Sequence, residues 1–118
     1  LVFEQAIFRW MSGDYQDQYQ ESWQQFKQRC VGALNELIYQ ELAHESGKAC
    51  VVFTSGGPIS VIIQHVLALD DQQALAINRQ LKNTGVTKLL FSAERLSIDY
   101  FNSYSHLSVA GNHWVSSL

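Results

Sequence analysis

The stretch that most constrains the fold is residues 51–69, "VVFTSGGPISVIIQHVLAL", where two apolar runs flank Ser-Gly-Gly-Pro. Residues 49–54 show no polar alternation, which is typical of a strand buried on both faces in a parallel sheet. Pro58 suits the first turn of a helix, and residues 59–69 are apolar almost all round. The stretch therefore predicts a buried strand, a tight turn and a mostly buried helix.

Hydrophobic periodicity predicts the remaining elements. These are helices at 2–12, about 20–45 and 71–81, an antiparallel hairpin of strands at 86–91 and 96–101, and a last short strand in 113–118. Trp10 and Trp23 fall on apolar helix faces and are expected in the core. The order of elements predicts a single domain, residues 1–118, of the α/β class, with helices packed on a mixed, mostly parallel sheet.

Composition and charge exclude several classes of protein. The net charge is −3 and no cluster of Lys and Arg exceeds two residues, which argues against a nucleic-acid surface. No apolar run reaches the roughly twenty residues that span a bilayer, and no basic-then-apolar leader opens the chain. Two cysteines, Cys30 and Cys50, make no disulfide framework, so we expect a cytoplasmic protein in which Cys50 packs in the buried strand. We expect no metal and no cofactor.

The turn itself admits three interpretations. Ser55, Gly56 and Gly57 follow a strand and precede a helix, so free backbone N–H groups and the positive end of the helix dipole face one space, which favours phosphate. Alternatively, the glycines serve a tight turn that binds nothing. A nucleophile elbow, with Asp99 and then His106 or His113 downstream, is less favoured because Phe53 stands where the elbow needs a glycine.

Four segments, in order, resemble a known family. "ESWQQFKQRCVGAL", which places Glu21, Ser22 and Arg29, is followed by "VVFTSGGPISVIIQHVLAL", "NTGVTKLLF" and "FNSYSHL". Each is weak alone, but together they cover most of residues 21–107. They resemble the C-terminal part of the histidine phosphatase superfamily, the phosphoglycerate-mutase-like proteins. The resemblance implies an incomplete fold of that kind, lacking its N-terminal strand.

The resemblance also implies phosphoryl transfer. In that family a histidine of an N-terminal Arg-His-Gly motif takes the phosphoryl group, and a second histidine, in a Ser-His-Gly-Gly turn, helps to hold it. This sequence has no Arg-His-Gly, and Ser55 stands where the second histidine is expected. The catalytic residues therefore stay unassigned. The phosphate-binding residues implied are Ser55, Gly56 and Gly57, with Thr54 and His106 at the edge of the pocket.

The expected function is that of a phosphatase of small phosphomonoesters, working through a phosphohistidine in the parent protein, with this chain supplying the Ser-Gly-Gly turn and inactive alone. A non-catalytic phosphate-ligand or regulatory module of the same fold is the alternative, and a structural domain is a third. The expected partner is a small phosphorylated substrate, with no nucleic acid and no membrane. Because the fold lacks a strand, we also expect an exposed sheet edge that is covered by a homodimer or by association with the missing half.

Overall fold

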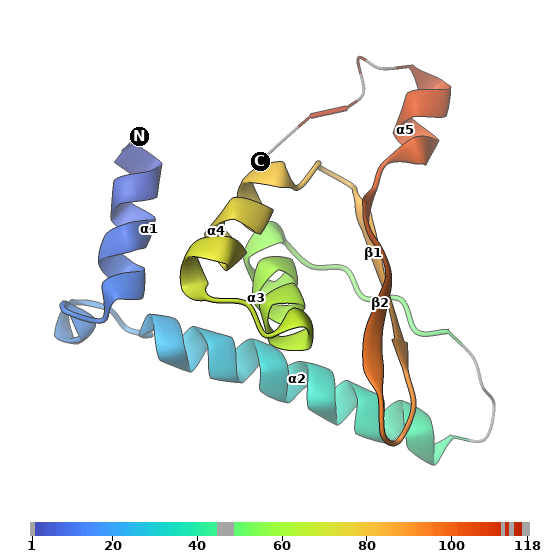
Figure 1. Cartoon of the computed structure of the whole chain (residues 1–118), viewed down its shortest axis with the longest axis horizontal. Helices are drawn as coiled ribbons and strands as arrows, with labels where there is room; N and C mark the ends of the chain where they lie inside the picture. Colours follow the sequence, from blue (N-terminus) through green and yellow to red (C-terminus); the bar gives the residue numbers. More distant parts are fainter. Residues whose placement is uncertain (1, 45–48, 112, 114, 117–118) are drawn as a thin grey trace.

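The computed structural model describes residues 2–44, 49–111, 113 and 115–116. Its elements are α1 (Val2–Ser12), the short 3-10 helix η1 (Gln16–Gln18), α2 (Trp23–Ala43), α3 (Gly56–Leu67), α4 (Asp71–Gln80), β1 (Val86–Phe91), β2 (Leu96–Ser103) and α5 (Ser105–Ala110). Figure 1 shows α2 along the base, α3 and α4 above it, and α1 and the β1–β2 hairpin towards its opposite ends. Helices α1 to α4 and the hairpin confirm the elements expected at those positions, whereas η1 and α5 form where no helix was expected.

Two helices begin at reciprocal caps that the sequence encodes. The Ser22 hydroxyl accepts a hydrogen bond from the Gln25 backbone N–H over 3.1 Å, and the Gln25 side chain accepts one from the Ser22 N–H over 2.9 Å. Asp70 and Gln73 repeat this arrangement at the start of α4. Each pair satisfies two backbone donors that a helix start would otherwise leave without partners, which fixes where α2 and α4 begin.

An aromatic core joins α1, α2 and α3. Trp23, Cys30 and Val61 are buried together, and Trp10 and Phe26 pack against them. The Trp10 and Trp23 rings meet edge to face, with centroids 5.3 Å apart and planes at 72°, a favoured geometry for aromatic pairs. The Trp10 indole N–H donates to the Glu21 carbonyl over 2.8 Å, so its polar atom is also satisfied. Trp23 is a core residue, as expected, and Trp10 is partly buried and packs against that core.

The sheet consists of the hairpin alone among the described residues. β1 and β2 pair antiparallel, with Leu89 opposite Ile98 and Phe91 opposite Leu96. The antiparallel hairpin is therefore confirmed, and the fold is α/β. The mixed, mostly parallel sheet is not found: the sheet of the described chain has two strands and no parallel pair.

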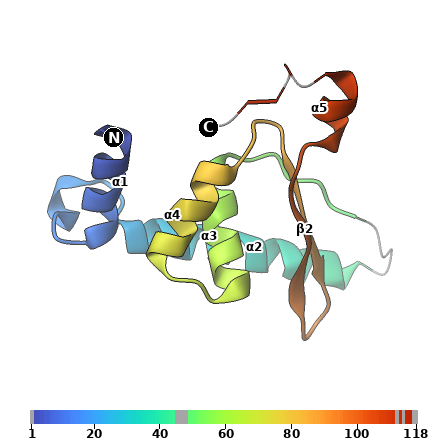
Figure 2. The same ribbon diagram turned by 45° about the horizontal axis from the view of Figure 1, so that its top comes forward.

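The strand predicted at 49–54 is the main correction. These residues form no strand and no backbone hydrogen bond with another described residue. Instead of being buried, Val51, Val52 and Phe53 are 76%, 59% and 95% exposed, and Cys50 is exposed rather than packed. Figures 1 and 2 draw the segment as a coil that crosses the hairpin. An apolar run becomes a buried strand only where a neighbouring strand accepts its backbone bonds, and no described strand does so.

The last short strand expected in 113–118 is also not found among His113, Val115 and Ser116; the other residues of that range lie outside the described chain. The Ser116 carbonyl instead accepts a single hydrogen bond, from the Asn83 N–H over 2.8 Å. In the part of the chain that the structure describes, no helix combines the length and the apolar character needed to cross a bilayer.

Candidate functional site

The Ser-Gly-Gly turn opens α3. Ser55 is the N-cap residue, with extended backbone, and its side chain is exposed and makes no capping hydrogen bond. Gly56 and Gly57 form the first two helical positions, so their N–H groups lie beyond the reach of intrahelical acceptors, and Pro58 has no N–H to offer. No hydrogen bond engages these two N–H groups within the described chain. The turn therefore combines two backbone donors without a described partner, of which Gly56 is buried and Gly57 half-buried, with the exposed Ser55 hydroxyl and the positive end of a twelve-residue helix.

Glycine at position 57 allows α2 to approach this helix start. A Cβ at Gly57 would lie 3.3 Å from Cζ of Phe26, a contact closer than side chains normally make. Phe26 also carries a cation on its ring, because the guanidinium carbon of Arg29 is 5.5 Å from the ring centroid. One aromatic side chain thus brings a positive charge into the neighbourhood of the Gly56–Gly57 donors.

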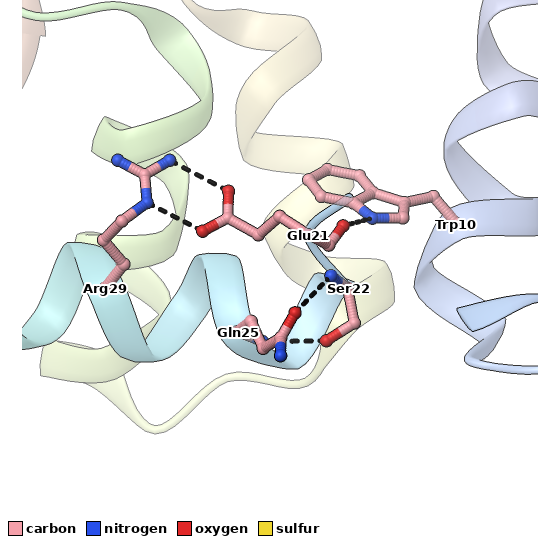
Figure 3. A network of polar contacts seen from close by, with 5 residues as sticks. All are labelled: Trp10, Glu21, Ser22, Gln25 and Arg29. Atoms are coloured by element: carbon pink, nitrogen blue, oxygen red, sulfur yellow. Dashed lines mark hydrogen bonds and ion pairs between the residues drawn. The ribbon is translucent and has the colours of Figure 1, made fainter. Parts of the chain in front are cut away.

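Arg29 is held by Glu21 in a two-pronged ion pair, shown in Figure 3. Arg29 Nε donates to Glu21 Oε2 over 2.8 Å, and Nη2 donates to Oε1 over 3.0 Å. The hydrogen bond from Arg29 lowers the pKa of Glu21, and Glu21 in turn raises the pKa of Arg29, so both groups are charged at neutral pH. The Arg29 side chain is 65% exposed, which leaves the guanidinium accessible from solvent. Ser22, the third residue of this segment, serves as the cap of α2.

Of the two residues predicted at the edge of the pocket, Thr54 directly precedes the turn and His106 is placed apart from it. Thr54 is exposed in the coil before the turn. His106 is exposed on α5, which both views place well away from the start of α3. A depression of about 530 Å³ lies where β2 passes into α5, and its lining residues, which do not include His106, are Asn102, Ser103, Tyr104, Ser105 and Val109.

The elements of a hydrolase triad are not assembled in the structure. Asp99 pairs with Lys88 on the neighbouring strand, with Nζ and Oδ2 3.3 Å apart. No side-chain hydrogen bond links Ser55 to Asp99 or to His106. Among the described residues, therefore, no base is hydrogen-bonded to the Ser55 hydroxyl to activate it as a nucleophile.

Sequence reasoning missed a polar cluster where α2, α3 and α4 meet. Asp71 accepts hydrogen bonds from Lys27 Nζ over 2.8 Å and from Gln64 Nε2 over 2.9 Å. Burial raises the pKa of Asp71, but these bonds and the facing Trp23 indole outweigh it, so the pKa lies below its usual value. The Trp23 N–H faces the carboxylate without reaching hydrogen-bonding geometry. No periodicity or motif marks a contact between residues 27 and 71.

A groove of about 630 Å³ runs between α2 and the C-terminal half of α3. It is lined by Lys27, Gln28, Val31, Gly32, Asn35, Val61, Gln64, His65, Ala68 and Leu69. Within the described ranges, no group of three His, Cys, Asp or Glu side chains is placed to hold a metal ion.

Comparison with known proteins bears on this site. No curated protein and no solved structure matches the chain. The model of the histidine phosphatase superfamily (branch 1) matches residues 3–104, which takes in α1 to β2, the Glu21–Arg29 pair and the Ser-Gly-Gly turn. The match supports a phosphatase- or mutase-like function in general terms. The chain belongs to the histidine phosphatase superfamily.

Proposed function

We propose that the parent protein is a phosphoryl-transfer hydrolase that acts on small phosphomonoesters through a phosphohistidine, and that this chain supplies its phosphate-side turn. The observation that carries the proposal is the start of α3. There the N–H groups of Gly56 and Gly57 and the Ser55 hydroxyl have no hydrogen-bond partner among the residues that the structure describes. Family membership supports the reaction class.

The turn suits the chemistry of phosphoryl transfer. That reaction depends on positioning the phosphoryl group and neutralising the charge on its oxygens. Two backbone donors, one hydroxyl and a helix dipole supply hydrogen bonds and partial positive charge without a formally charged side chain. Arg29 packs on Phe26 near the turn with its charge paired to Glu21, and a phosphate dianion would compete with the Glu21 carboxylate for its guanidinium.

The phosphoryl-accepting histidine is proposed to come from outside residues 1–118. None of His44, His65, His106 and His113 stands in an Arg-His-Gly motif. We therefore expect the isolated chain to bind phosphate at the turn without hydrolysing an aryl phosphate. We expect the parent protein to form an acid-labile phosphoprotein and to turn the same compound over.

A non-catalytic phosphate-binding or regulatory module is the second candidate. Ser55 favours it, because a hydroxyl in place of a histidine brings no positive charge and no base. Experiments on the parent protein distinguish the two functions. Turnover that falls on Ser55→Ala would argue for the catalytic function, whereas phosphate binding with no phosphorylation and no turnover would argue for the module.

The binding test uses the isolated chain, labelled with nitrogen-15 and titrated with inorganic phosphate at constant ionic strength. We expect the Gly56 and Gly57 amide resonances to move most, and Arg29→Gln to weaken binding by about tenfold. Arg79→Gln is the matched control, because Arg79 is an exposed arginine that also pairs with a glutamate, Glu4, but lies on α4. If the two glycine resonances stay fixed while phosphate is added, the phosphate turn is refuted.

A further inference from the structure

Ser60 places a hydroxyl inside the largely apolar helix α3. It is only 3% exposed, and Val61 and Ile63 beside it are buried as well. Removing a hydroxyl from water costs free energy unless it finds a hydrogen-bond partner, and serine favours a helix less than alanine does. The contacts of this hydroxyl therefore decide what serine contributes at this position.

The Ser60 hydroxyl has two acceptors within reach. Its Oγ donates to the Gly56 carbonyl over 2.8 Å, and it lies 3.2 Å from Oδ1 of Asn78 on α4. Because a hydroxyl carries one hydrogen, it donates to one of these oxygens at a time, and the shorter distance favours Gly56. Ser60 thus binds back onto the first helical residue of α3, inside the Ser-Gly-Gly turn.

The Gly56 carbonyl belongs to the same planar peptide group as the Gly57 N–H. In a helix these two groups point in opposite directions along the axis, so the carbonyl faces Ser60 while the N–H faces the open start of α3. A hydrogen bond to the carbonyl polarises the peptide group and makes its N–H a stronger donor, more so where water is excluded. Gly57 is half-buried whereas Gly56 is buried, so Gly57 is the more accessible of the two residues that offer donors.

We propose that Ser60 is a positioning residue of the phosphate turn, which polarises and orients the Gly56–Gly57 peptide group so that the Gly57 N–H donates more strongly to a bound phosphoryl oxygen. The inference rests on the proposed function, since it requires phosphate at the turn. Ser60 itself is buried and acts only through that peptide group. The hydroxyl also fixes the plane of a peptide between two glycines, which have no side chains to restrict it.

The test compares the nitrogen-15-labelled chain with its Ser60→Ala variant during titration with inorganic phosphate. We expect Ser60→Ala to raise the Kd for phosphate about threefold, the part of a charge-assisted bond that polarisation supplies. Without phosphate, the Gly57 amide proton should move upfield as its donor weakens. The Gly56 amide belongs to the preceding peptide group and should move much less. Far-ultraviolet circular dichroism checks that the variant keeps its helices.

Asn78→Ala is the matched control, because it removes the other contact of Ser60 and leaves the bond to the Gly56 carbonyl in place. It should bind phosphate as tightly as the unsubstituted chain. If Ser60 only joined α3 to α4, the two variants would behave alike.

Two results would overturn the positioning role while the phosphate turn stands. One is an unsubstituted chain that binds phosphate no more tightly than Ser60→Ala, and the other is a Gly56 amide that shifts as far as the Gly57 amide. A chain that shows no phosphate binding at Gly56 and Gly57 would instead refute the proposed function, and the role of Ser60 with it.

Discussion

Asp71 of α4 binds side chains of α2 and α3. Replacing it should therefore lower the free energy of unfolding more than replacing the neighbouring Asp70. Asp71→Asn removes the charge that holds Lys27 of α2 and Gln64 of α3 against the start of α4. Asp70→Asn is a matched control in the preceding position. It also removes one negative charge from the same helix start, but asparagine caps a helix as well as aspartate does.

The expected difference follows from the contacts. Hydrogen bonds to a charged group contribute about 1.5–3 kcal/mol each, but Asp71 and Lys27 keep 34% and 21% of their side-chain surface exposed, so solvent screening reduces that contribution. Asparagine also retains one acceptor. We therefore expect Asp71→Asn to lower the free energy of unfolding by about 2 kcal/mol. Asp70→Asn, which loses only its interaction with the helix dipole, should cost at most about 0.5 kcal/mol.

Urea unfolding followed by far-ultraviolet circular dichroism, at one protein concentration, measures both variants. Asp71→Asn should lower the midpoint by roughly 1 M relative to Asp70→Asn. Tryptophan fluorescence is a poor probe here, because the Trp23 indole faces the substituted side chain. If the two substitutions lower the free energy of unfolding equally, the contacts with Lys27 and Gln64 do not stabilise the fold and the reasoning is refuted.

The pH dependence supplies a second check on Asp71. The folded chain lowers the pKa of this carboxyl below its ordinary value of 3.8, so folding favours the ionised form. The stabilisation is therefore present in full above that value and is lost as the pH falls from it through the lower folded pKa. The advantage of the unsubstituted chain over Asp71→Asn should shrink across that range. An advantage that stays constant into strong acid would contradict the assignment.

Substituting alanine for either of two glycines should change the free energy of unfolding in opposite directions, and the same urea assay measures both variants. Gly32 lies within α2, and a Cβ there would meet nothing within 4 Å, so Gly32→Ala should raise the free energy of unfolding by about 1 kcal/mol; a loss would show that α2 is not helical there. At Gly85 a Cβ would lie 2.7 Å from Asn102 Oδ1 and 3.0 Å from the Lys82 carbonyl. Gly85→Ala should therefore cost about 1–3 kcal/mol by displacing the Asn102 oxygen from the Lys82 N–H, and an unchanged midpoint would contradict this contact.

Helices α1 to α4 and the hairpin could be predicted because their signals are local. The Ser22–Gln25 cap and the periodicity of α2 lie within a few turns of one helix, and the alternation in β2 needs only its neighbour β1. The strand predicted at 49–54 was wrong because its formation depends on a partner that lies far away in the sequence. The apolar run indicates that these residues favour burial, but it does not specify which segment would bury them.

In the candidate site, too, the features that depend on neighbouring residues could be predicted and those that depend on distant contacts could not. The place of Gly56 and Gly57 at a helix start follows from the glycines and the proline after them, which are local. No local pattern predicts that Glu21 and Arg29 belong to the site; only the family resemblance indicates it. The pair lies near the turn because Phe26, on which Arg29 packs, contacts Gly57. The Asp71 cluster joins three helices across 44 positions of sequence, a separation at which no local pattern can indicate a contact.

The cluster at Asp71 has a consequence for how the molecule opens. Because one carboxylate binds groups from two other helices, α2, α3 and α4 cannot separate without breaking the same bonds. α1 and the hairpin take no part in that cluster. The three central helices therefore form one cooperative unit whose amides exchange with solvent hydrogen only when the unit unfolds, while the two ends of the molecule open locally and at lower free energy.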